Sequence, residues 1–348
     1  MLIDSILGTV ISFSFTLFLT PIFKNILTKY SVLELRNKRK IHKKLVPSMG
    51  GVIFVFSFFC GLLFTFEISE LSEVKYIILS LLMMLFIGLR DDIIPIPAKE
   101  KLISQILPIL LIIFFNNYHL KSLNGFLGIY DLPYWLGVVL STLVFLCIVN
   151  SYNLIDGIDG LACSISVITL SVFNILLITN SFKSLMSDAV IILIASIVAF
   201  LVYNWQPAKI FMGDTGALFL GFFNSILVLD FINTPNETIS SPLAFILAIL
   251  AIPIIDTLRT FISRIIRGVS PFTPDKTHIH HMLLRLGLSH SQTVFLLSIV
   301  NLMFILVAFL IKSFPDTISI VLITSLGLLS SLSLDLMVKR KILLRKSN

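Results

Sequence analysis

Charged residues and cysteines are both scarce in this sequence. Asp, Glu, Lys and Arg make up 13% of its 348 residues, whereas 57% are hydrophobic and the mean hydropathy is +1.01. This balance excludes a soluble globular domain. The three cysteines (Cys60, Cys147 and Cys163) lie in apolar segments, without a Cys-x-x-Cys pair or a nearby histidine. We therefore interpret them as small core residues and infer neither a zinc site nor a redox pair.

Other familiar features are also missing. The first apolar run, 6–23, has only Asp4 and no basic residue before it, so it differs from a cleaved secretory signal peptide. The chain has no soluble-domain boundary, no low-complexity tract and no convincing internal repeat, and many transporters are built from repeats. The net charge of +7 lies in loops, so we expect no nucleic-acid partner.

Apolar runs of nearly twenty residues recur from end to end, which predicts an all-α polytopic integral membrane protein. Eleven transmembrane helices fit, several of them near the lower length limit, at about 4–23, 49–66, 74–90, 102–117, 133–150, 160–179, 186–203, 213–231, 242–262, 292–312 and 317–338. With the N-terminus outside, the inner loops hold 22 of the 26 Lys and Arg residues. This bias predicts an outside N-terminus and a cytoplasmic C-terminus. We expect one transmembrane domain, 1–348.

The same topology places the acids and histidines that could carry chemistry on one side of the membrane. Ordinary solvated loop charges would not favour one face, and acids at membrane depth usually line a polar cavity. We therefore predict one active site on the cytoplasmic loops 24–47, 90–101, 150–160, 204–216 and 259–290.

The segment 150–161, Asn-Ser-Tyr-Asn-Leu-Ile-Asp-Gly-Ile-Asp-Gly-Leu, lies between two apolar runs. Its two asparagines and two aspartates recur every third residue, and in an α-helix each such step drifts by about 60°. They can converge on one ligand only if the backbone tightens or breaks, which Gly157 and Gly160 make easy. The plainer interpretation is a polar loop with an Asp-Gly turn.

Two further segments suit a metal ion and a phosphate. Asp91 and Asp92 end a predicted span, and adjacent carboxylates repel unless a cation lies beside them. Mg²⁺ prefers such oxygen ligands, although an Asp pair also caps helices. Asp214 lies between glycines at a predicted helix start, where a backbone can approach a phosphate closely. Its plainer role is that of an N-cap.

A cluster of three histidines, at 278, 280 and 281, follows a stretch that contains three arginines. These bases suit an anionic diphosphate at least as well as zinc. Lys101 begins a predicted span and could hold a phosphate or extend to the interface. Together with the carboxylates, these groups suit phosphoryl transfer between a soluble nucleotide and a lipid at the inner membrane surface.

On these residues the sequence resembles the polyprenyl-phosphate N-acetylhexosamine-1-phosphate transferases of glycosyltransferase family 4. The matching stretches follow the family's order from about Arg39 to Gly287: the segment from His42 to Gly51, Asp91-Asp92, 150–161, 204–208, 211–216 and 278–281. The last of these resembles the bacterial branch that loads N-acetylglucosamine-1-phosphate onto undecaprenyl phosphate.

The resemblance implies a phosphotransferase of the bacterial inner (cytoplasmic) membrane, with its active site facing the cytoplasm. Its implied donor is UDP-N-acetylglucosamine, its acceptor undecaprenyl phosphate, its surroundings membrane lipid, and its cofactor Mg²⁺ or Mn²⁺. The product would start an O-antigen (lipopolysaccharide), enterobacterial common antigen or wall teichoic acid.

The resemblance also implies roles for individual residues. The implied metal ligands are Asp214, Asn153, Asp91 and Asp92. The implied catalytic residues are Asp91, Asp92, Asp156 and Asp159. The implied substrate-binding residues are Lys101, Asn204, His278, His280 and His281. Among these, Asp91 would deprotonate or orient the lipid phosphate, and Asp92 would support the metal.

Two alternatives stay open. One is an inner-membrane transporter, which also uses intramembrane acids. The missing repeat, the one-sided acids and the absence of any charged residue clearly mid-span disfavour it; Asp230 and Asp256, near span ends, are the nearest exceptions to the last point. The other is the same reaction with a different UDP-N-acetylhexosamine. The sequence decides neither the polymer that is started nor whether the chain forms a homodimer.

Overall fold

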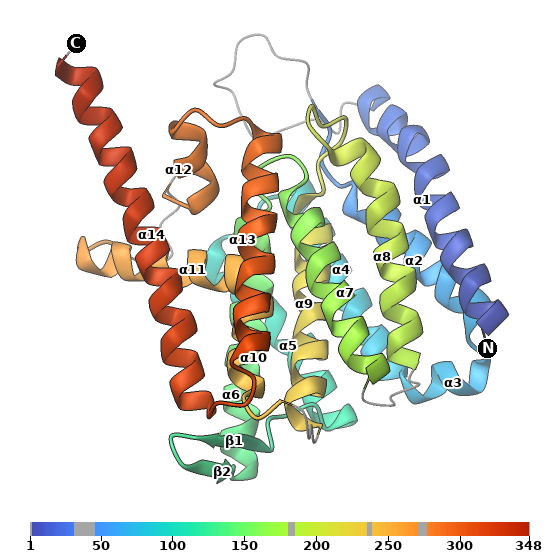
Figure 1. Cartoon of the computed structure of the whole chain (residues 1–348). Coiled ribbons are helices and arrows are strands. Elements are labelled where there is room, and N and C mark those ends of the chain that lie inside the picture. The colour runs from blue at the N-terminus through green and yellow to red at the C-terminus, as the bar shows by residue number, and fades with distance from the viewer. Residues whose placement is uncertain (1, 31–45, 180–184, 235–238, 271–276, 348) are drawn as a thin grey trace. The chain divides into compact units, whose positions relative to one another are not determined.

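The computed structural model of the chain describes residues 2–30, 46–179, 185–234, 239–270 and 277–347 (Figure 1). Within these ranges helices dominate, which confirms the predicted all-α class. In chain order the elements are α1 (Leu2–Lys29), α2 (Gly51–Thr65), α3 (Ile68–Glu73), α4 (Lys75–Ile93), α5 (Ala98–Asn116), β1 (Ser122–Phe126), β2 (Ile129–Asp131), α6 (Tyr134–Ile155), α7 (Leu161–Thr179), α8 (Leu185–Asn204), α9 (Gly213–Asn233), α10 (Pro242–Ile249), α11 (Ala251–Ile266), α12 (Ile279–Arg285), α13 (His290–Leu310) and α14 (Asp316–Ser347).

The chain divides into two compact units. Unit 1 comprises Met1–Asn117 and Asp159–Asn224, and unit 2 comprises Tyr118–Ile158 and Ser225–Asn348. Each unit is therefore assembled from segments that are distant in the sequence. The expectation of one transmembrane domain stays a prediction.

In unit 1, α1 packs against α2 and α8, α7 packs against α8, and α4 packs against α5. Glycines bring three backbones together around the start of α9. A Cβ on Gly51 would overlap the backbone of Gly216, and a Cβ on Gly88 would overlap that of Thr215. The first turn of α9 is consequently enclosed by α2 and α4.

Unit 2 contains a broken helix. Helices α10 and α11 meet at an angle of 86°. Pro253 has no N–H to donate to the carbonyl of Ile249, its helical partner four residues earlier. The Nδ2 of Asn301 in α13 donates to this carbonyl at 3.1 Å, and its Oδ1 accepts from the N–H of Ile252 at 3.3 Å. One buried amide thus satisfies two backbone groups at the break.

Unit 2 also contains a short antiparallel hairpin that hydropathy did not predict. Ser122 pairs with Asp131, and Phe126 pairs with Ile129. The two residues between the strands, Leu127 and Gly128, both have positive φ (52° and 78°). A two-residue hairpin turn of type I′ requires such positive φ values at both central residues.

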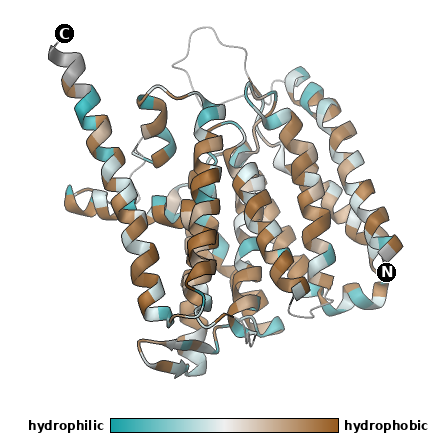
Figure 2. Ribbon diagram, in the orientation of Figure 1, coloured by the Kyte–Doolittle hydropathy of each residue, from teal (hydrophilic) through white to brown (hydrophobic). Residues whose placement is uncertain are grey.

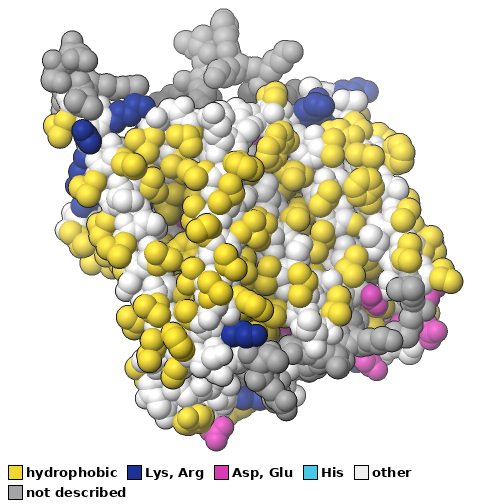
Figure 3. All heavy atoms as spheres, viewed as in Figure 1, with side chains coloured by type: hydrophobic (Ala, Val, Ile, Leu, Met, Phe, Trp, Pro, Cys, Tyr) yellow, Lys and Arg dark blue, Asp and Glu magenta, His cyan; other side chains and the backbone are white. Residues whose placement is uncertain are grey.

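Seven helices in the described part of the chain are long and apolar enough to cross a membrane, and the bent pair α10–α11 raises this to eight. Figure 2 shows their predominantly apolar character, and Figure 3 shows apolar side chains spread over the face in view. The chain is therefore a multi-pass membrane protein.

The expected count of eleven spans is not supported. All eleven ranges overlap helices, but α2 has only 15 residues. Helices α4 and α5 each carry three charged residues within one turn of an end: Arg90, Asp91 and Asp92, and Lys99, Glu100 and Lys101. Helix α2 is too short, and α4 and α5 carry too many charges near one end. By length and composition, these three helices therefore do not qualify as membrane spans.

Replacing Asn301 tests the role of its amide at the helix break. Asn301→Leu leaves a buried carbonyl and a buried N–H without partners, at about 1–3 kcal/mol each. We expect the melting temperature of the purified protein in detergent to fall by several degrees. Leu302→Ala, one residue further along α13 and 50% exposed, is the control and should change it little. An unchanged melting temperature for Asn301→Leu would contradict this role.

Candidate active site

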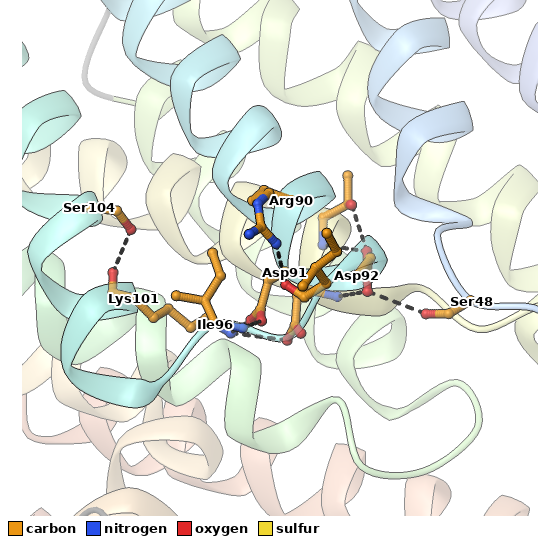
Figure 4. A network of polar contacts seen from close by, with 10 residues as sticks. Ser48, Arg90, Asp91, Asp92, Ile96, Lys101 and Ser104 are labelled. Carbon is orange, nitrogen blue, oxygen red and sulfur yellow. Dashed lines mark hydrogen bonds and ion pairs between the residues drawn. The ribbon is translucent and has the colours of Figure 1, made fainter. Parts of the chain in front are cut away.

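The first turn of α9 is capped by an aspartate from α4. The first N–H groups of a helix have no partner within it. Oδ1 of Asp92 accepts from the N–H of Asp214 at 2.9 Å, and Oδ2 accepts from the N–H and Oγ1 of Thr215 at 3.0 and 2.6 Å. Ser48 adds a longer contact to Oδ1 at 3.4 Å (Figure 4). Asp214 is therefore a first-turn residue of α9, and the cap comes from Asp92.

Gly213 makes this cap possible. Its φ is +79°, in the left-handed region that favours glycine. A Cβ there would also lie 2.6 Å from both carboxylate oxygens of Asp92. The Gly-Asp-Thr-Gly stretch thus lets a carboxylate from another helix reach the N–H groups of α9.

A buried ion network joins α4, α5 and α9. Nζ of Lys101 lies 2.7 Å from Oδ2 of Asp91 and 3.1 Å from Oδ1 of Asp214. Oδ1 of Asp91 also accepts from the N–H of Ile96 at 2.7 Å (Figure 4). All three charged side chains are buried. Removing one member of such a network leaves a costly buried charge.

The two carboxylates of this network, which both contact the ammonium group of one lysine, fit the chemistry of a magnesium site. No group of three or more His, Cys, Asp or Glu side chains in the described residues is arranged to hold a metal. Mg²⁺, however, is commonly bound by one or two carboxylates together with water and substrate phosphates. Asp91 and Asp214 are such a pair, with the ammonium of Lys101 between them. Their role as metal ligands stays a prediction.

Backbone contacts join the other motif segments of unit 1. Oδ1 of Asn204 accepts from the N–H of Gly160, and its Nδ2 donates to the carbonyl of Ile210, each at 3.0 Å. Oδ2 of Asp159 accepts from the N–H of Ala208 at 3.1 Å. Both side chains were predicted to bind substrate or assist catalysis; the contacts show that they also shape the 204–216 loop.

The segment 47–51 lies along the same loop. The N–H of Phe211 donates to the carbonyl of Pro47 at 2.8 Å, and the N–H of Gly50 donates to the carbonyl of Phe211 at 2.9 Å. The motif stretches 47–51, 91–92, 159–160 and 204–216 therefore meet within unit 1. His42 and the rest of 31–45 lie outside the described residues.

The backbone breaks within the 150–161 segment, although α6 continues past the expected span end at residue 150. Helix α6 ends at Ile155, Gly160 has a φ of +77°, and α7 begins at Leu161. The boundary between the two units falls between Ile158 and Asp159. Convergence of Asn150, Asn153, Asp156 and Asp159 on one ligand stays a prediction.

In unit 2 the histidine segment is tied to α11. Oδ1 of Asp256 accepts from the N–H of Ile279 at 2.8 Å, and its Oδ2 lies 3.1 Å from Nδ1 of His278. The rings of His278 and His280 are parallel, with centroids 5.8 Å apart. His281 lies beside His280, with centroids 4.3 Å apart. The three predicted histidines are thus close neighbours.

Asp256 was missed as a site residue, because it was interpreted only as a charged residue near a span end. A signal was present: Asp256 and Arg259 are three residues apart, on one face of a helix that precedes the histidines. Arg259 donates to the carbonyl of Thr277 and, at 2.7 Å, to Oδ1 of Asp335 in α14. Both residues hold the start of the histidine segment.

His280 is buried and uncharged. Burial lowers its pKa to about 3, with the neighbouring histidines adding to this and Asp256 opposing it. Its ring fills a space that exists because residue 157 is glycine, since a Cβ there would overlap Nε2. At neutral pH this imidazole therefore contributes a hydrogen-bonding group to the cluster, and no charge.

Comparison with known proteins decides the family. Residues 74–232 match glycosyl transferase family 4. A probable undecaprenyl-phosphate N-acetylglucosaminyl 1-phosphate transferase of Bacillus subtilis (strain 168) is 32% identical over 330 residues, which cover 92% of this chain and 89% of that protein. The chain belongs to glycosyl transferase family 4.

More distant relatives agree with this. Undecaprenyl-phosphate alpha-N-acetylglucosaminyl 1-phosphate transferases of Escherichia coli O157:H7 and Yersinia pestis are each 28% identical over 296 residues. These cover 82% of this chain and 78% and 79% of the relatives. The predicted enzyme class, a membrane phosphotransferase of family 4, is confirmed. The family match includes Asp91, Lys101 and Asp214 but ends before the histidine segment.

The cap on α9 of this family 4 enzyme can be tested with two substitutions. Asp92→Ala removes the acceptor for two N–H groups and two hydroxyl groups, and misplacement of Asp214 by about 1 Å would lower turnover about a hundredfold. Asp92→Asn keeps one acceptor oxygen but places its Nδ2 donor against the N–H of Thr215, so its activity should lie between those of the wild type and Asp92→Ala. Transfer is measured in membranes with matched protein amounts. Near-normal activity in Asp92→Ala would contradict the role of the cap.

Proposed function

We propose that the chain transfers N-acetylglucosamine-1-phosphate from UDP-N-acetylglucosamine to undecaprenyl phosphate, with UMP as the second product. The relatives named above support this donor and acceptor at 28–32% identity over most of the chain. The observation that carries the proposal is the buried ion network, in which two carboxylates face one cation within the matched family region. Phosphoryl transfer is mainly a matter of positioning and charge neutralisation, and this network supplies both.

In the proposed reaction, an oxygen of the lipid phosphate attacks the β-phosphorus of the nucleotide sugar. A new P–O bond forms there, and the bond to the UMP oxygen breaks. Asp91 orients or deprotonates the attacking phosphate, and Lys101 moves from the carboxylates toward phosphate oxygens as these arrive. His278, His280 and His281 bind the diphosphate, and Asn204 lies on the uridine side.

A divalent ion fits this scheme. Asp91 and Asp214 would hold Mg²⁺ or Mn²⁺, with Asn153 as a further ligand and Asp92 as support through the α9 cap. The ion would neutralise charge on the diphosphate and on the leaving UMP. Asp156 and Asp159 would assist at the nucleotide sugar.

We further propose that the chain lies in the bacterial cytoplasmic membrane, with the N-terminus outside and the loops that carry the site in the cytoplasm. The bias of Lys and Arg toward one set of loops supports this orientation. The lipid product would start a surface polysaccharide such as O-antigen, common antigen or teichoic acid.

Transfer is tested with radiolabelled UDP-N-acetylglucosamine, undecaprenyl phosphate and Mg²⁺ in membranes that contain the protein. We expect label to enter the lipid phase, EDTA to stop this, and added UMP to reverse it. Transfer only from another UDP-N-acetylhexosamine would change the donor and keep the mechanism. No transfer from any donor would overturn the proposal and favour a transporter.

Asp214→Asn tests the ion network in the same assay. The substitution removes a charge that pairs with Lys101 and is proposed to hold the metal, so turnover should fall at least about a hundredfold. The variant should still insert into membranes at normal amounts. Asp131→Asn, at an exposed aspartate in β2, is the matched control and should retain activity. Near-normal turnover in Asp214→Asn would contradict the proposed site.

A further inference from the structure

Asp256 is buried in α11, and both of its carboxylate oxygens accept hydrogen bonds from the histidine segment. It is 2% exposed, and its partners are the N–H of Ile279 and Nδ1 of His278. A buried carboxylate is costly unless it is hydrogen-bonded. If the segment moved away, this carboxylate would lose both bonds. The position of the segment and the burial of Asp256 are therefore coupled.

This contact also selects a tautomer of His278. A carboxylate can only accept hydrogen bonds, so Nδ1 of His278 carries the proton that lies between the two groups. Nε2, on the opposite side of the ring, is then the atom left to meet a ligand. An outer partner that fixes the tautomer and orientation of an imidazole is a common device where histidines bind a ligand.

The constraint extends beyond His278. His280 stacks parallel to it, so a tilt of the first ring would disturb the second. Arg259 holds the carbonyl of Thr277, which immediately precedes His278. Asp256 and Arg259 lie on one face of α11 and together fix the segment. They hold the side chain of His278 and the backbone on both sides of this residue.

We infer that Asp256 is a positioning residue for substrate binding: it holds His278 in the Nδ1-protonated tautomer and directs Nε2 to the diphosphate of the nucleotide sugar. This inference rests on the proposed function. It assigns to Asp256 a role that acts entirely through the histidine segment.

Asp256→Asn is the sharpest test, because asparagine has almost the same shape. Its Oδ1 can accept from the N–H of Ile279, but its Nδ2 then faces Nδ1 of His278. That pair can bond only if Nδ1 becomes an acceptor, which moves the proton to Nε2. We expect the KM for UDP-N-acetylglucosamine to rise about 10- to 100-fold, with kcat changed far less. An unchanged KM would overturn the inference.

A double-mutant cycle shows whether Asp256 acts through His278. His278→Ala should raise KM, and adding Asp256→Asn to it should raise KM no further. Independent effects that multiply would contradict positioning. His278→Asn provides a second variant if Asp256→Asn does not fold. Its amide replaces the Nδ1 donor but supplies no Nε2, so stability should be kept while KM rises; a normal KM there would also overturn the inference.

The four proteins of the cycle (the wild type, Asp256→Asn, His278→Ala and the double variant) also separate this inference from the proposed function. Wild-type turnover with UDP-N-acetylglucosamine is measured first, and its absence would overturn the function alone. The contact is then tested without activity, from melting temperatures in detergent. Destabilisation by Asp256→Asn should largely vanish in the His278→Ala background, whereas equal destabilisation in both backgrounds would disprove the contact. Asp131→Asn serves as the control throughout.

Discussion

The capping of α9 by Asp92 is the contact on which the geometry of unit 1 depends. The N–H groups of Asp214 and Thr215 require an acceptor, and a carboxylate from α4 supplies it. This requirement determines which residues can surround the cap: glycine at 213, where a side chain would strike the carboxylate, and glycine at 88, where α4 lies against α9. The Asp214 side chain then meets Lys101 and Asp91. The cap on this helix end thus positions Asp214 beside two other candidate site residues.

The arrangement in unit 2 is different. There, polar side chains of one helix hold a loop, whereas in unit 1 a side chain of one helix caps another helix. Asp256 and Arg259 on α11 bind the backbone at the start of the histidine segment, and the α10–α11 break is satisfied by Asn301. Both arrangements obey one physical rule. Backbone groups that are withdrawn from water and from regular helices must find side-chain partners.

Much of this was predictable from the sequence, since the signals were strong and local. Long apolar runs predicted the helical membrane class, and Gly157 and Gly160 indicated where the backbone could break after α6. The Asp91-Asp92 pair was predicted to need a cation, and Lys101 is its neighbour. Asp92 as a cap was not predictable, because its partners lie more than a hundred residues away. Asp256 was missed because its partner His278 lies 22 positions further along the chain, beyond a loop whose path hydropathy does not define.

The position of Lys101 has a consequence for how the enzyme is assembled. Metal sites made of carboxylates alone repel themselves until the ion arrives, so their folding waits for metal. Here an ammonium group of the chain lies between Asp91 and Asp214. The repulsion between these two carboxylates is therefore offset by a group of the chain itself, so their side of α9 can fold without help from an added cation.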